Sequence, residues 1–132
     1  GIKLRESKSA QEGEFVNLIQ LEIKTDKEVK KVFGTLSSNK QPRIVKIDDY
    51  YLYFYLIWEM VFIRNSDKLG LIGSLGTLMG KSGINIAAMT FGRDEQGGKA
   101  ISVLNVDSQV SLEIQDKIRE LENILTVKVI RT

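Results

Sequence analysis

The chain contains neither cysteine nor histidine among its 132 residues. The first absence excludes disulfides and thiolate metal sites. The second removes the commonest general base and the commonest imidazole metal ligand. We therefore expect no ordinary enzyme active site, and no resident cofactor or metal, within this chain.

Long apolar runs and concentrations of one charge are missing as well. No run approaches the roughly eighteen apolar residues of a membrane span, and no signal peptide is visible, so we expect a cytoplasmic protein with no membrane partner. The formal net charge is +2, without a basic stripe, and we expect no nucleic-acid partner. Apolar residues at 42% and charged residues at 27% are typical of a soluble globular protein.

A nucleotide-binding motif is also absent, although one stretch resembles it. GTLMGKS has three residues between Gly76 and Gly80, where a phosphate-binding P-loop needs four. Lys81 and Ser82 stand at the end of a predicted helix, whereas a phosphate loop must open one. The glycines of this stretch need another explanation.

Residues 1–57 predict a mostly β partial domain. Residues 1–13 are polar and a poor core former, and we expect them to be the trailing end of something larger. Strand-like patterns follow at residues 15–23, 32–36, 43–47 and 50–56.

Residues 58–132 predict a compact α+β domain. A strand at 60–63 leads into a turn at residues 65–67 and a helix of apolar residues at helical spacing, which Gly83 ends. Strands at 84–91 and 100–106 flank a hairpin turn at Gly97 and Gly98. A second helix and a strand at 126–130 complete a βαββαβ order, which predicts a ferredoxin-like layer of helices on a four-stranded sheet.

The second helix carries clear local signals. Ser111 is a good N-cap, and Glu113 lies in the first turn, four residues before Lys117. The first helix instead carries Gly73, Gly76 and Gly80 along one narrow strip. The strip indicates either close packing of this helix on its own sheet or a surface that admits a second backbone or a small ligand.

Polar residues at the two ends of the first helix suggest a binding site. Asn65, Asp67 and Gly70 enter the helix, and Asn85 follows it. The helix would keep Asn85 away from Asp67 within one subunit, but the two could meet across an interface between two copies. Asp67 can pair with an ammonium group, and the backbone at Leu69 and Gly70 can bind a carboxylate. The alternative is an Asn/Asp turn that merely caps the helix.

These residues carry a resemblance to a known family. The stretches Asn65-Ser-Asp67-Lys-Leu-Gly70, Gly83-Ile-Asn85-Ile-Ala87, Met89-Thr-Phe-Gly92-Arg93 and Leu104-Asn-Val-Asp107 resemble an ACT domain, more narrowly the C-terminal regulatory domain of the D-3-phosphoglycerate dehydrogenase family. The stretches Phe15-Val-Asn17-Leu-Ile19, Phe33-Gly34-Thr35-Leu36 and Pro42-Arg43-Ile-Val45-Lys-Ile47-Asp48 are similar to the end of that family's intervening, allosteric substrate-binding domain.

The resemblance implies a regulatory fragment of an enzyme that oxidises 3-phosphoglycerate with NAD on the way to serine. The catalytic and nucleotide-binding domains of that enzyme would precede everything in this chain, so the chain alone should be inactive. ACT domains of the family pair side by side as a homodimer and bind L-serine at the interface, which gives feedback inhibition.

Carried over by motif, the serine contacts would be Asn65, Asp67, the backbone of Leu69 and Gly70, and Asn85 from the partner chain. Arg43 is a weaker candidate for an anion contact in the upstream domain. One departure is Leu69, which stands where the family usually has proline and makes the loop less stiff.

Two other functions remain open at this point. The chain could be the regulatory chain of an iron–sulfur L-serine dehydratase, which joins similar domains. It could also be a purely structural dimerisation domain that binds nothing.

Overall fold

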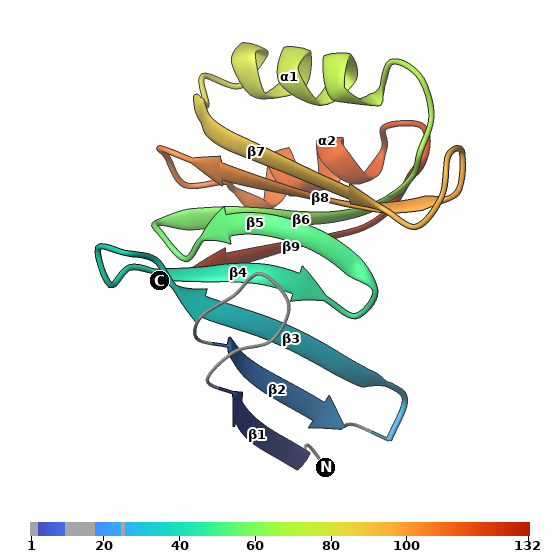
Figure 1. Ribbon diagram of the computed structural model, residues 1–132. Helices are drawn as coiled ribbons and strands as arrows, with labels where there is room; N and C mark the ends of the chain where they lie inside the picture. The colour runs from blue at the N-terminus through green and yellow to red at the C-terminus, as the bar shows by residue number, and fades with distance from the viewer. Residues whose placement is uncertain (1–2, 10–17, 25) are drawn as a thin grey trace. The chain divides into compact units, whose positions relative to one another are not determined.

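The computed structural model describes residues 3–9, 18–24 and 26–132, and the chain divides into two compact units, Gly1–Leu56 and Ile57–Thr132 (Figure 1). Phe15 and Asn17, which belong to the predicted first strand and to the family resemblance, lie outside the described residues. No helix in the described part of the chain is long and apolar enough to cross a membrane.

The first unit contains a five-stranded antiparallel sheet whose strands pair in sequence order. The strands are β1 (Lys3–Ser9), β2 (Leu18–Lys24), β3 (Val29–Leu36), β4 (Pro42–Ile47) and β5 (Tyr50–Tyr55). In β5 the buried Leu52 and Phe54 alternate with the exposed Tyr51 and Tyr53, as expected for a strand with one covered face. The polar start of the chain forms β1, because an edge strand needs only backbone pairing with its neighbour.

The second unit has the predicted βαββαβ order, and its α+β class is confirmed. The elements are β6 (Glu59–Ser66), α1 (Leu71–Lys81), β7 (Ile86–Arg93), β8 (Lys99–Val106), α2 (Leu112–Arg119) and β9 (Ile124–Arg131). The antiparallel sheet has the strand order β7-β8-β6-β9, so β7 and β9 form its edges.

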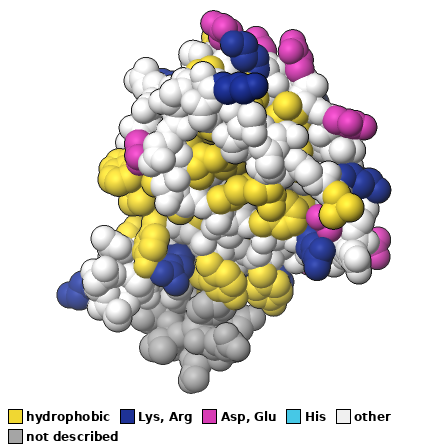
Figure 2. Space-filling view, turned by 90° about the horizontal axis from the view of Figure 1, so that it is seen from above, with side chains coloured by type: hydrophobic (Ala, Val, Ile, Leu, Met, Phe, Trp, Pro, Cys, Tyr) yellow, Lys and Arg dark blue, Asp and Glu magenta, His cyan; other side chains and the backbone are white. Residues whose placement is uncertain are grey.

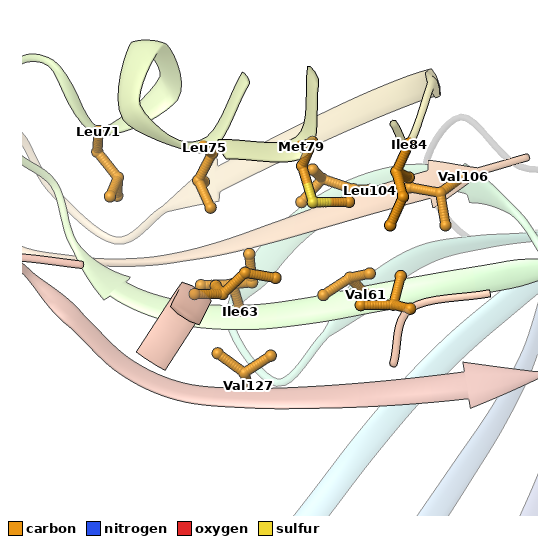
Figure 3. Packing of buried hydrophobic residues seen from close by; sticks show 11 residues of the cluster. Val61, Ile63, Leu71, Leu75, Met79, Ile84, Leu104, Val106 and Val127 are labelled. Carbon is orange, nitrogen blue, oxygen red and sulfur yellow. The ribbon is translucent and has the colours of Figure 1, made fainter. Parts of the chain in front are cut away.

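The core of the second unit lies between the two helices and one face of this sheet. Figure 3 shows Leu71, Leu75 and Met79 pointing from α1 towards the strands, as their spacing of four residues requires. They meet apolar side chains of β6, β8 and β9, namely Val61, Ile63, Leu104, Val106 and Val127. Full burial of each large apolar side chain contributes about 1.5–3 kcal/mol, so this layer fixes α1 on the sheet.

The helix ends follow local sequence signals. Gly83 has a φ of 71°, and the amides of Gly83 and Ile84 donate to the carbonyls of Gly80 and Met79. This is the Schellman pattern of a glycine-terminated helix, which confirms the predicted end of α1. In α2, Ser111 accepts a hydrogen bond from the Ile114 amide at 3.3 Å, which confirms the predicted cap.

The predicted turn at residues 65–67 is wrong in its first two positions. Asn65 and Ser66 belong to β6 and pair with Ala100 and Lys99 of β8. The Asn65 side chain donates to the Ser66 carbonyl and accepts from the Ser102 hydroxyl at 3.0 Å. A residue type that favours turns is retained in a strand because its neighbouring strand satisfies the amide.

Candidate functional site

Topology brings the ends of β6 and β7 together. Both strands run antiparallel to β8. They therefore run parallel to each other, and their C-terminal ends lie at the same end of the sheet. Asp67 follows β6 directly, and Arg93 is the last residue of β7. The end of the sheet at which β8 begins therefore brings the acidic Asp67 close to the basic Arg93.

Asp67 is tied to the β7–β8 hairpin by three hydrogen bonds. Its Oδ2 accepts from Arg93 Nη1 at 3.1 Å and from the Gly97 amide at 3.2 Å. Its backbone amide donates to the Gly98 carbonyl at 2.8 Å. The Gly97 amide first, and the Arg93 guanidinium second, hold the pKa of the Asp67 carboxyl below its usual value. Asp67 is therefore an anion at neutral pH, as a partner for an ammonium group must be.

The backbone of the hairpin favours glycine at one position. Gly97 has a φ of 74°, in the left-handed region that favours glycine. A Cβ on Gly98 would contact the Asp94 side chain, which would have to move aside. The predicted hairpin turn is confirmed, and the glycines hold its backbone against Asp67. Sequence reasoning did not identify Arg93 and Gly97 as the partners of Asp67. The predicted order of strands nevertheless placed all three residues at the same end of the sheet.

Asn65 lies beneath the site instead of at its surface. Its side chain is fully buried, and both ends of its amide are used within the unit, by Ser66 and Ser102. In this conformation Asn65 presents no surface to a ligand. Its hydrogen bond with Ser102 links the end of β6 to β8 below the site, and this part of the two strands is called the floor of the site.

Leu69 and Gly70 form the turn that enters α1. Gly70 has φ and ψ of 85° and −9°, values of the third position in a type II turn, which puts Leu69 at the second position, where proline is common. The Leu69 side chain is fully exposed. The first turn of α1 has neither a side-chain cap nor an acidic residue. The free amides at the start of α1 therefore have no charged partner from this helix.

Asn85 lies at the other end of α1 and β7. Its Nδ2 donates to Oδ2 of Asp107 at 2.6 Å, and its carbonyl accepts from the Asp107 amide. The eight residues of β7 separate Asn85 from the Arg93 end by about 25 Å at the usual rise per residue. The structure therefore does not bring Asn85 and Asp67 together within one chain.

The outer face of α1 carries no charged residue before Lys81 in the last turn. A Cβ on Gly73, Gly76 or Gly80 would meet nothing within 4 Å, so the interpretation that this strip packs on its own sheet is wrong. Ile72 beside the strip is half exposed, and Lys81 is the only charged residue of the helix. Figure 2 looks onto this side of the molecule: hydrophobic and uncharged surface fills its centre, and charged side chains lie towards the margin.

Arg43 occupies a different environment in the first unit. Its Nη2 donates to the Tyr55 hydroxyl, and the guanidinium lies 4.5 Å from the centre of the Tyr55 ring. On the same strand, Lys46 Nζ lies 5.0 Å from the ring of Tyr51 and 5.3 Å from that of Phe33. Lys46 is a further cation of β4 that contacts aromatic rings, and a role in anion binding stays a prediction for Arg43.

No cluster of three or more potential metal-ligating carboxylates occurs among residues 3–9, 18–24 and 26–132.

Comparisons with known proteins assign both units. Residues 1–48 match the D-3-phosphoglycerate dehydrogenase intervening domain, and residues 60–123 match the ACT domain. The chain is 36% identical over 92% of its length to the D-3-phosphoglycerate dehydrogenase of Methanocaldococcus jannaschii, and 33% identical over 98% to that of Bacillus subtilis. It spans 23% and 25% of these two relatives, about a quarter of their length.

Proposed function

Because the chain belongs to the D-3-phosphoglycerate dehydrogenase family and corresponds to its C-terminal regulatory part, we propose that it is the amino-acid-sensing region of such an enzyme. The whole protein would be a cytoplasmic, NAD-dependent dehydrogenase of 3-phosphoglycerate, subject to feedback inhibition by L-serine. The residues of this chain would supply the effector site and the dimer contact, and none of the chemistry.

The dimer contact follows from α1 and β7. The outer edge of β7 has no strand partner among the described strands, and an open edge with exposed Ala87 and Ala88 is a template for pairing with another strand. The glycine strip of α1 allows a second backbone to approach closely, since none of the described residues fills the space above it. We propose that two copies pair side by side through these elements about a two-fold axis.

The single observation that carries the effector site is the separation of Asp67 from Asn85. Antiparallel pairing of α1 and β7 with their counterparts would place the partner's Asn85 beside Asp67, and the reverse at the second site. An ammonium group would bind Asp67, the amides at Leu69, Gly70 and the first turn of α1 would attract a carboxylate, and the partner's Asn85 would bind the serine hydroxyl. Buried Asn65 would support the floor.

The comparisons support one part of this proposal, a dehydrogenase as the parent enzyme. An intervening-domain segment ahead of the ACT domain supports a dehydrogenase rather than the regulatory chain of an iron–sulfur L-serine dehydratase. A purely structural dimerisation domain would account for the glycine strip and the open edge of β7. It would not need an uncapped start of α1 shortly after an ionised aspartate in the chain.

Calorimetric titration of the chain with L-serine tests the proposal. We expect the wild type to bind at millimolar concentration or better, and Asp67→Ala and Asn85→Ala each to lose affinity by tens-fold or more, because a charged or polar group of serine is left unpaired. Asp116→Ala is the matched control, since Asp116 is a carboxylate of α2 that pairs with Arg119 at 2.7 Å and is not among the proposed effector contacts. A wild type that binds no L-serine would leave the structural dimerisation domain as the better account.

A further inference from the structure

The ion pair between Asp67 and Arg93 is incompletely satisfied. Only Oδ2 of Asp67 and Nη1 of Arg93 take part in it, and no other side-chain hydrogen bond of either residue, apart from that of the Gly97 amide, occurs among the described residues. The Arg93 side chain is 54% exposed and that of Asp67 is 18% exposed. The pair thus keeps unused donors on the guanidinium and an unused acceptor on the carboxylate, side by side at one entrance.

Arg93 is not needed to shape this entrance. The Gly97 amide on Oδ2 and the bond from the Asp67 amide to Gly98 already fix the hairpin against the end of β6. Exposed ion pairs contribute little to stability, so the pair can open at small cost. The guanidinium therefore has a place in the site that the fold alone does not explain.

Resting on the proposed function, we propose that Arg93 reads the carboxylate of the effector, so that the site selects α-amino acids over simple amines. The Asp67–Arg93 pair opens, and Asp67 binds the ammonium group of the effector. Arg93 binds the carboxylate, whose carbon is two bonds away from the ammonium nitrogen. A guanidinium presents parallel donors that match a carboxylate. Each charge of the α-amino acid thus pairs with the opposite charge of the opened ion pair. Because the ligand is a zwitterion, the net charge of the site is unchanged.

Two probes separate this role from general attraction of the effector. L-Serine carries the ammonium, the hydroxyl and the carboxylate, whereas ethanolamine has the first two and lacks the third. Calorimetric titration of the chain with both ligands, for the wild type, Arg93→Gln, Arg93→Lys and Lys128→Gln, measures the contribution of the carboxylate at each variant. Lys128 lies exposed on β9 at the opposite edge of the sheet and controls for loss of one positive charge.

We expect Arg93→Gln to weaken L-serine binding by about 10-fold to 100-fold, the range for a charge-assisted hydrogen bond, and to leave ethanolamine within about 2-fold. Arg93→Lys should recover part of the loss, because lysine keeps the charge without the fork. Lys128→Gln should match the wild type. Unchanged melting temperatures would show that Arg93→Gln leaves the fold intact.

The proposal is overturned if Arg93→Gln binds L-serine as tightly as the wild type while Asp67→Ala does not bind, since the helix amides then hold the carboxylate and the proposed function survives. It is also overturned if Arg93→Gln weakens L-serine and ethanolamine equally, because the arginine then acts only by holding Asp67. A wild type that binds neither ligand removes the proposed function together with the inference.

Discussion

Helices α1 and α2 cover the same sheet, but their outer surfaces differ in kind. The surface of α2 has a capping serine, an acidic first turn, a basic last turn and ion pairs between Glu113 and Lys117 and between Asp116 and Arg119. The surface of α1 has no side-chain cap, no ion pair within the part of the chain that the structure describes, and three glycines that face open space. The charged surface of α2 is suited to contact with water. The uncharged, glycine-rich surface of α1 is suited to contact with another protein surface.

The difference has an energetic side. Each glycine destabilises a helix by up to about 1 kcal/mol relative to alanine, and no close contact with the described residues offsets this cost. Stability is therefore given up along α1 at the positions where we propose that a second copy packs. A sequence selected only for a stable monomer would place alanine there.

A charge on the glycine strip should have the largest effect. In Gly76→Arg two guanidinium groups would face each other across the proposed two-fold axis, and like charges at an interface cost several kcal/mol. We expect the dimer dissociation constant, measured by sedimentation equilibrium, to rise by about 100-fold or more, and L-serine binding to be lost with it. The monomer should stay folded, because arginine is a good helix former and the position is open.

Glu120→Arg at the end of α2 is the control for that change, because it adds an arginine to the charged helix. It should leave both dimerisation and L-serine binding unaltered. If instead Gly76→Arg dimerises as the wild type does, α1 is not the contact, and the comparison between the two helices loses its functional meaning.

Single substitutions should shift helix stability in opposite directions. In the Gly76→Arg background, where dimerisation does not contribute, Ser111→Ala should lower the free energy of unfolding by about 1 kcal/mol through loss of the α2 cap. Gly80→Ala should raise it by up to about 1 kcal/mol. Urea unfolding measures both. A destabilising Gly80→Ala would mean that the space above α1 is filled within one chain.

Salt should distinguish the carboxylates at the two helices, with the smallest effect of all. The pKa values of Asp67 and Glu113 are both lowered, so each carboxylate stabilises the fold above its ordinary pKa and loses this effect as pH falls through the lowered one. The main cause is the Gly97 amide for Asp67 and Lys117 for Glu113. In NMR titrations, high salt should return the Glu113 pKa towards its usual value, and that of Asp67 much less. Equal responses would contradict this.

Local signals predicted α2 and the end of α1 correctly because their causes lie within a few residues. Ser111, Glu113 and Gly83 act on the helix that contains or precedes them. The prediction at the end of β6 was wrong because the residue that keeps Asn65 in the strand is distant in sequence. The Asn65 side chain accepts a hydrogen bond from Ser102, which lies 37 residues further along the chain. Composition favours a turn at such a residue, and only the paired strand overrides it.

The candidate site was predicted in its parts but not in its connections. Asp67, Gly70 and Asn85 could be selected from helix ends and from family motifs, and their placement in the fold supports the proposed pairing. Arg93 was missed because its link to Asp67 spans 26 residues, with α1 and β7 between the two. The predicted strand order already made β6 and β7 parallel, so opposite charges at their ends were the available signal.

The measurement that tests the central claim most directly is subunit complementation between two defective chains. Asp67→Ala and Asn85→Ala should each bind L-serine weakly when alone, since both sites of either homodimer lack one residue. Mixed in equal amounts and allowed to exchange, half of the dimers should be heterodimers with one intact site, which restores wild-type affinity at roughly a quarter of the wild-type stoichiometry. If the mixture binds no better than its components, Asp67 and Asn85 do not act from opposite subunits, and the account is wrong.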